Sequence, residues 1–138
     1  MAKTYTAPFA QTPQNATAVT TGACADFDGD TPTNTVLLLT AGSEGGLLTK
    51  LTAIPRDTVT ASNLMLFISD DSGTTKRLIN SALLSTQTVD TTTPMTKTEF
   101  SDYSETTPLR LEALNELYVG NAVAASSGVV FFAEFTNF

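Results

Sequence analysis

From Thr35 onward, short apolar runs alternate with turn residues about every ten positions, a spacing typical of a β-sandwich or barrel. Only Leu109 to Leu117 has apolar residues at helical spacing, and two short strands explain that window better. We therefore predict an all-β protein, folded as an antiparallel β-sandwich of about eight strands.

The apolar runs themselves are the expected strands, and in chain order they are 35–40, 48–54, 63–69, 76–84, 97–100, 108–111, 116–120 and 129–136. The first is apolar at successive positions, which predicts a strand covered on both faces. In the second, Leu51 and Ala53 should point into the core. Leu48 joins them only if a β-bulge lies near Thr49. Residues 85–96 are too polar for a core and predict a long loop.

The run 129–136 is the clearest strand, because its odd-numbered positions up to 135 are all apolar and predict an inward face. Val130 and Phe132 then lie on the opposite face and need a cover. Few lysines are present to protect an exposed sheet edge. We therefore expect a homo-oligomer, a trimer, with these two residues or the adjacent edge at the contact. Alternatively, residues 1–20 or the loop 85–96 fold back over this face.

Residues 1–21 contain two prolines and isolated apolar side chains in a polar setting. They predict an extended N-terminal arm that precedes a sandwich domain spanning residues 22–138. Tyr5 and Phe9 are lone aromatic side chains in this stretch, and we expect them to anchor the arm against a neighbouring subunit. A disordered terminus is the alternative.

Composition narrows the possible partners. At 138 residues the chain has the size of one domain, and its net charge of −7 argues against a nucleic-acid-binding surface. No apolar stretch approaches the ~20 residues of a membrane helix, and no signal peptide is evident at the start, so we expect the protein to stay in the cytoplasm where it is made. The single cysteine, Cys24, is expected to be a small buried hydrophobe.

The inventory of reactive side chains argues against an enzyme. Histidine is absent, which excludes Ser-His-Asp and Cys-His arrangements. The fourteen acidic residues leave a glycosidase-like carboxylate pair arithmetically possible, but nothing in the sequence singles one out. We therefore expect no catalytic residues and no cofactor.

One acidic cluster, Asp26 to Asp30, invites a calcium assignment because alternating carboxylates gather hard oxygen ligands. Its spacing does not fit an EF-hand: Gly29 stands fourth instead of sixth, and Leu37 replaces the bidentate glutamate. We predict a polar turn in which Gly29 adopts the unusual backbone angles, and no metal site.

The order of segments resembles small capsid-decorating proteins of tailed bacteriophages. The resemblance rests on an Asp28-Gly29-Asp30 turn followed by TVLLLTAG (35–42), LMLFISDDSG (64–73), RLINSALL (77–84) and PLRLEALNELYVG (108–120). It implies a jelly-roll-like sandwich with an N-terminal arm that binds the outside of an icosahedral shell, often as a trimer, and reinforces it. The major capsid protein and sister copies are then the partners, and the virion surface is the location.

Two segments depart from the family pattern, namely residues 112–115 and the threonine-rich residues 86–98. The resemblance also leaves two alternatives open. One is a tail, baseplate or fibre-attachment component of the virion. The other is a carbohydrate-binding sandwich module.

Overall fold

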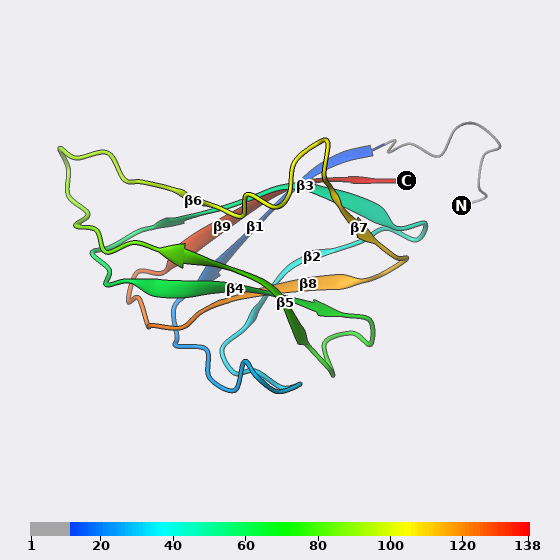
Figure 1. Ribbon diagram of the computed structural model, residues 1–138, viewed down its shortest axis with the longest axis horizontal. Helices are drawn as coiled ribbons and strands as arrows, with labels where there is room; N and C mark the ends of the chain where they lie inside the picture. Colours follow the sequence, from blue (N-terminus) through cyan, green and yellow to red (C-terminus); the bar gives the residue numbers. More distant parts are fainter. Residues whose placement is uncertain (1–11) are drawn as a thin grey trace.

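The protein folds into two antiparallel sheets that pack face to face (Figure 1). The structure is a computed structural model, and it describes residues 12–138. Sheet A contains, in spatial order, β1 (Thr12–Thr20), β9 (Val129–Asn137), β3 (Gly46–Pro55) and β6 (Thr98–Glu99), and β7 (Leu109–Leu111) also pairs with β3. Sheet B contains β2 (Val36–Thr40), β8 (Glu116–Asn121), β4 (Ser62–Ser69) and β5 (Arg77–Leu84). The predicted all-β sandwich is confirmed.

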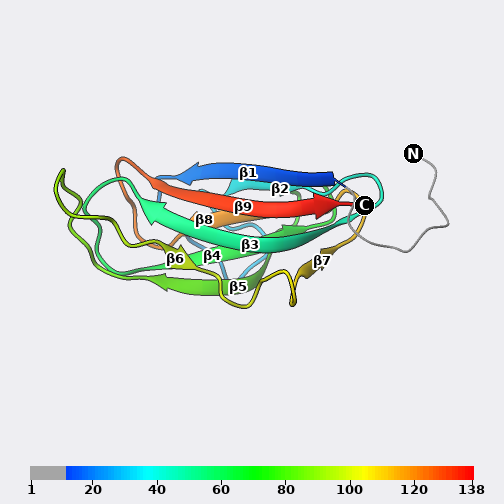
Figure 2. The ribbon, with the colours of Figure 1, turned by 90° about the horizontal axis from the view of Figure 1, so that it is seen from above.

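The strand pairs are nested along the chain. β4 pairs with β5, β3 with β6 and β7, β2 with β8, and β1 with β9. This is the pattern of one long hairpin, and pairing of β9 with β3 and of β8 with β4 rolls it into two sheets (Figure 2). A double sheet of this connectivity is a jelly roll.

The N-terminal boundary differs from the predicted one. Residues 12–20 are an edge strand of sheet A, paired with β9 at nine positions from Thr12 opposite Asn137 to Thr20 opposite Val129. Ala18 and Thr20 on this strand are buried. The sandwich therefore begins at Thr12 instead of residue 22. The strand was not predicted because its inward positions hold small and polar residues, which give no pattern of large apolar side chains.

All eight predicted strands are present, and the predicted bulge is confirmed by a register shift between Leu48 and Lys50. The bulge lets Leu48, Leu51 and Ala53 all face the core. The prediction for residues 35–40 was wrong in one respect. β2 is an edge strand of sheet B, and Leu37 is 43% exposed instead of covered.

The main core lies between the sheets, where the odd-numbered residues of β9 meet the leucines of β4. Phe131, Leu64 and Leu66 have no exposed surface. A second, smaller cluster of buried side chains, made of Cys24, Met65 and Phe67, packs on the other face of β4. The predicted role of Cys24 as a small buried hydrophobe is confirmed, since only 3% of it is exposed.

At one end of the sandwich, hydrogen bonds join the loop that follows β3 to the loop that follows β8. A carboxylate oxygen of Asp57 accepts hydrogen bonds from the Ser126 hydroxyl at 2.6 Å and the Ser127 backbone N–H at 2.9 Å. The Arg56 backbone N–H donates to the carbonyl of Gly128 at 2.9 Å. Gly128 has a φ of +91°, and a Cβ there would collide with Val19, so glycine is required at the entry to β9.

The hydrogen bonds that Asp57 accepts from Ser126 and Ser127 should weaken in acid. These hydrogen bonds, first that from the Ser126 hydroxyl, hold the pKa of Asp57 below its ordinary value of 3.8. Because the folded-state pKa is depressed, this stabilisation is complete above the ordinary value and is lost as pH falls through the folded pKa. We expect Asp57→Asn to melt at a lower temperature than wild type at neutral pH. The difference in Tm should shrink as pH falls below 3.8 and vanish once Asp57 is protonated in the folded protein, and a difference that persists unchanged would contradict the assignment.

Candidate functional site

The structure places two of the four predicted interface residues. Val130 and Phe132 lie on the outer face of sheet A, away from the core, and both are half-buried. Tyr5 and Phe9 precede the described residues 12–138, so their expected role remains a prediction. The tertiary pairing brings further side chains beside Val130 and Phe132.

Two cross-strand rows surround this pair of residues. Val130 lies directly between Val19 on β1 and Ile54 on β3, and all three are half-buried apolar side chains. In the next row, Phe132 lies between Thr17 and Thr52. Directly opposite residues in neighbouring strands share a face of the sheet. We call the surface formed by these six residues the sheet A outer face.

An ion pair borders the sheet A outer face. In the following row, the Lys50 ammonium lies 3.8 Å from a Glu134 carboxylate oxygen, and both side chains are nearly half exposed. Exposed pairs of this kind contribute roughly 0 to 1 kcal/mol. The apolar row around Val130, the neighbouring Phe132 and the charged border have the organisation expected of a modest protein contact, which places apolar groups centrally and polar groups at the rim.

The outer face of sheet B, by contrast, is largely covered by the chain itself. Residues 21–35 cross it, and the Cys24 backbone N–H donates to the carbonyl of Asn121 at 2.8 Å. A Cβ at Gly120 would lie 3.2 Å from the Cβ of Cys24, so this glycine allows the crossing segment to approach β8 closely. This cover explains why the neighbouring strand β4 is buried on both faces.

Two basic residues hold the covering segment in place. The Arg77 Nε lies 3.2 Å from a carboxylate oxygen of Asp30. The Lys76 ammonium donates to the Thr35 hydroxyl at 3.0 Å and lies 4.5 Å from the centre of the Tyr118 ring. Lys76 and Arg77 therefore tie the Asp26 to Asp30 turn to the start of β5.

The Asp26 to Asp30 segment is a turn, as predicted. The Gly29 backbone N–H donates to the Asp26 carbonyl at 3.1 Å. The unusual backbone angle belongs to Asp26, with a φ of 56°, so the prediction for Gly29 was wrong. Aspartate tolerates this left-handed conformation better than most residues. Within residues 12–138, no group of three or more acidic or cysteine side chains is placed to hold a metal ion.

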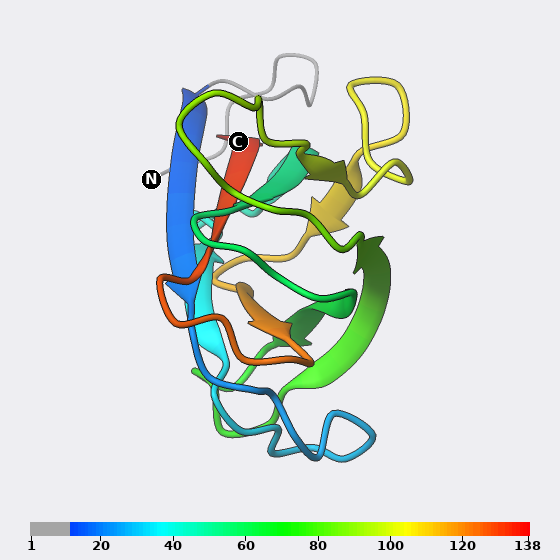
Figure 3. The same ribbon diagram turned by 90° about the vertical axis from the view of Figure 1, so that its left-hand side faces the viewer.

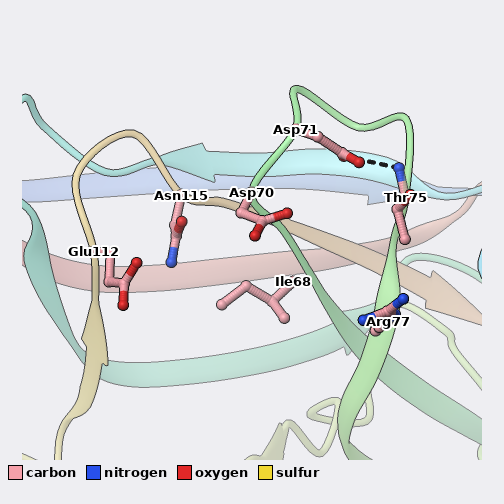
Figure 4. Close-up of a pocket in the computed structure, with 7 residues that line it drawn as sticks. All are labelled: Ile68, Asp70, Asp71, Thr75, Arg77, Glu112 and Asn115. Atoms are coloured by element: carbon pink, nitrogen blue, oxygen red, sulfur yellow. Dashed lines mark hydrogen bonds between the residues drawn. The ribbon is translucent and has the colours of Figure 1, made fainter.

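A pocket of about 350 Å³ opens beside the β4–β5 turn (Figure 4). Its lining is mostly polar and consists of Ile68, Asp70, Asp71, Thr75, Arg77, Glu112 and Asn115. One Asp71 carboxylate oxygen accepts hydrogen bonds from the Thr75 backbone N–H at 2.8 Å and the Ser69 hydroxyl at 2.9 Å. Asp71 therefore shapes the turn instead of pointing freely into the pocket.

Asp71 does not have the character of a glycosidase general acid. The hydrogen bond from Thr75, followed by that from Ser69, lowers the pKa of Asp71, whereas a general acid needs a raised pKa. No aromatic ring is among the lining residues to stack on a sugar. The geometry thus supports a structural role for Asp71 at this turn.

The exposed apolar surface on strand β5 was not predicted from the sequence. Three of its side chains are large, apolar and exposed: Leu78 at 41%, Ile79 at 39% and Leu83 at 62%. The sequence shows a run of apolar residues in 76–84, but it does not show that this strand lies at the edge of a sheet. Other exposed large apolar side chains are spread over loops and turns and one other strand, namely Phe27, Leu37, Met95, Leu114 and Val123.

Comparison of the chain with protein-family models, curated proteins and solved structures finds no match. Among residues 12–138, no helix is long and apolar enough to cross a membrane. The functional assignment therefore depends on the geometry described above and on the resemblance noted in the sequence.

Proposed function

We propose that this chain is a structural virion protein that binds the outer surface of a phage capsid and reinforces the shell. Two independent lines support the proposal. The order of the sequence segments resembles capsid-decorating proteins, and the jelly-roll topology agrees with the fold that this resemblance implies. Because many unrelated functions share this fold, the topology alone is only a fold-level analogy.

The observation that carries the proposal is the distribution of apolar side chains outside the core. The sheet A outer face presents Val19, Val130, Ile54 and Phe132 together, and β5 exposes three more large apolar residues. Contiguous apolar surface on a folded domain commonly marks a contact with another protein. The polar pocket beside the β4–β5 turn is a less developed alternative, and no group of three or more acidic or cysteine side chains in residues 12–138 is placed to hold a metal ion.

The proposed partners are the major capsid protein and sister copies of the chain, arranged as a homotrimer. The sheet A outer face, with Val130 and Phe132, is the proposed contact between sister copies. A net charge of −7 disfavours nucleic acid as a partner. The protein would act on the virion surface after synthesis in the host cytoplasm, without a cofactor or catalytic residues.

The arm supplies a direct test of the proposal. A deletion of residues 2–11 removes Tyr5 and Phe9 but leaves every described strand intact. If the two aromatic residues are anchors, each contributing about 1 to 3 kcal/mol, the deletion should weaken binding to undecorated capsids at least about tenfold. Occupancy is measured by quantitative gel analysis of sedimented particles, and the Tm of both proteins serves as the folding control.

The first of three informative outcomes bears on the arm alone, and the other two would argue against capsid decoration. Full occupancy by the truncated protein would show that the arm is dispensable. Absence of wild-type protein from purified heads, with recovery on tails, would favour the tail or baseplate alternative. Specific binding to a glycan array would favour a carbohydrate-binding module.

A further inference from the structure

The outer edge of β5 has no ladder partner among residues 12–138, although the segment after β6 approaches the strand, where the Asn80 amide donates to an Asp102 carboxylate oxygen at 3.2 Å. β5 pairs with β4 on one side, and within residues 12–138 no strand pairs with its other side. Proteins usually protect such edges with lysine, proline or inward-pointing charges. β5 contains no lysine or proline, and its only charged residue, Arg77, is paired with Asp30. A β-bulge at Ile79, between Leu78 and Asn80, is the one protective feature of this edge.

The exposed side chains of β5 lie along the outer face of sheet B. Leu78 is opposite Phe67 and Leu83 is opposite Asn63, and these β4 residues share a face with Met65. Apolar side chains therefore stand above an unpaired backbone edge. A strand that adds to this edge would gain main-chain hydrogen bonds and apolar contacts at once.

Residues 2–10 have the pattern that this edge requires. In an extended strand, Tyr5, Ala7 and Phe9 share one face, which places two aromatic rings where Leu78 and Leu83 can meet them. Pro8 has no N–H, and it fits an edge strand when its nitrogen points away from the partner strand. Lys3 is the only charged side chain in this segment of a chain whose net charge is −7, so the approach is electrostatically favourable.

The segment cannot reach β5 of its own chain in this way. β1 and β5 lie at opposite edges of the two sheets (Figure 3). Three strand spacings across a sheet and one spacing between sheets give a separation of roughly 18 Å. Phe9 is three residues before Thr12, and three extended residues span at most about 11 Å. Phe9 therefore falls short of β5 in its own chain, so an added strand that includes Phe9 needs the edge of a second copy.

We propose that residues 2–10 of one copy add as a strand to the free edge of β5 in a second copy. The contact is head-to-tail, because the donor and acceptor surfaces differ, and head-to-tail contacts form rings such as trimers when the rotation between copies closes. This inference rests on the proposed homo-oligomer and names the surface that the arm occupies. It requires no capsid, so it is tested on the isolated full-length protein.

The first experiment compares two charge insertions at equally exposed leucines. Leu83→Lys places a charge on the β5 edge, whereas Leu114→Lys does so at the β7–β8 turn, where the leucine is 64% exposed. Multi-angle light scattering at micromolar concentration should show an oligomer for wild type and Leu114→Lys. Leu83→Lys and Phe9→Ser should each weaken association at least about tenfold while keeping the wild-type circular dichroism spectrum. A monomeric wild type, or an oligomer unaffected by Leu83→Lys, would overturn the proposal.

A second experiment identifies the occupant directly. A Phe9→Cys protein is mixed with a Leu83→Cys protein under mild oxidation, and we expect a disulfide-linked dimer that contains one of each. Cys24 should not compete, because it is buried and burial raises the pKa of its thiol. In a chain that carries both substitutions, a disulfide within one copy would show that the arm pairs with β5 of its own chain, and this result would contradict the proposal. Failure of either experiment leaves binding of the wild-type protein to undecorated capsids as an independent test of the proposed function.

Discussion

Replacement of Phe131 by alanine is expected to lower the free energy of unfolding by about 3 to 5 kcal/mol. The side chain has no exposed surface and lies in the main core between the two sheets. Its removal loses apolar contacts and leaves a cavity that the surrounding strands cannot fill completely. For a chain of this size, the Tm should fall by on the order of 10 °C. Thermal and urea unfolding followed by circular dichroism provide the measurement.

The adjacent residue supplies the matched control. Phe132 is the same amino acid on the same strand, but it lies on the sheet A outer face and is half-buried. Phe132→Ala should therefore cost the isolated subunit roughly 1 kcal/mol or less. Equal losses in the two variants, measured at a concentration where both are monomeric, would show that the inward and outward faces of β9 have been assigned incorrectly.

Deletion of residues 2–20 should abolish the folded state, although deletion of residues 2–11 should not. The longer deletion removes β1, which pairs with β9 at nine positions and covers the core with Ala18. It would expose a new edge of β9 and open one side of the main core. We expect loss of the cooperative thermal transition and rapid cleavage by a nonspecific protease. A cooperative transition in the longer deletion, close to that of wild type, would mean that β1 is an accessory strand.

The two deletions also separate folding from binding. Loss of capsid binding by the 2–20 deletion alone would report only an unfolded domain. Loss by the 2–11 deletion, with an unchanged Tm, would report a contact made by the arm. The position of Thr12 at the start of β1 defines where this cut must be made.

The sandwich itself could be predicted because its signals are local. Alternation along β9 assigns Phe131 inward and Phe132 outward, and polar turns separate the strands. Even the bulge near Thr49 followed from the sequence, since Leu48 and Leu51 cannot otherwise share a face. Each of these features depends on the period-two geometry of an extended chain, which is written into a few consecutive residues.

Only the tertiary structure decided which segments are neighbours. β1 has alanine and threonine at its inward positions, and its place in the sheet comes from pairing with β9 more than a hundred residues away. Leu37 is exposed and β4 is covered on both faces because of strand order and the crossing of residues 21–35. The free edge of β5 and the grouping of Val19 and Ile54 around Val130 arise in the same way. Contacts between distant residues leave no local periodic signal, so the sequence alone indicates the strands that carry an apolar pattern but neither β1 nor the surfaces that the strands form together.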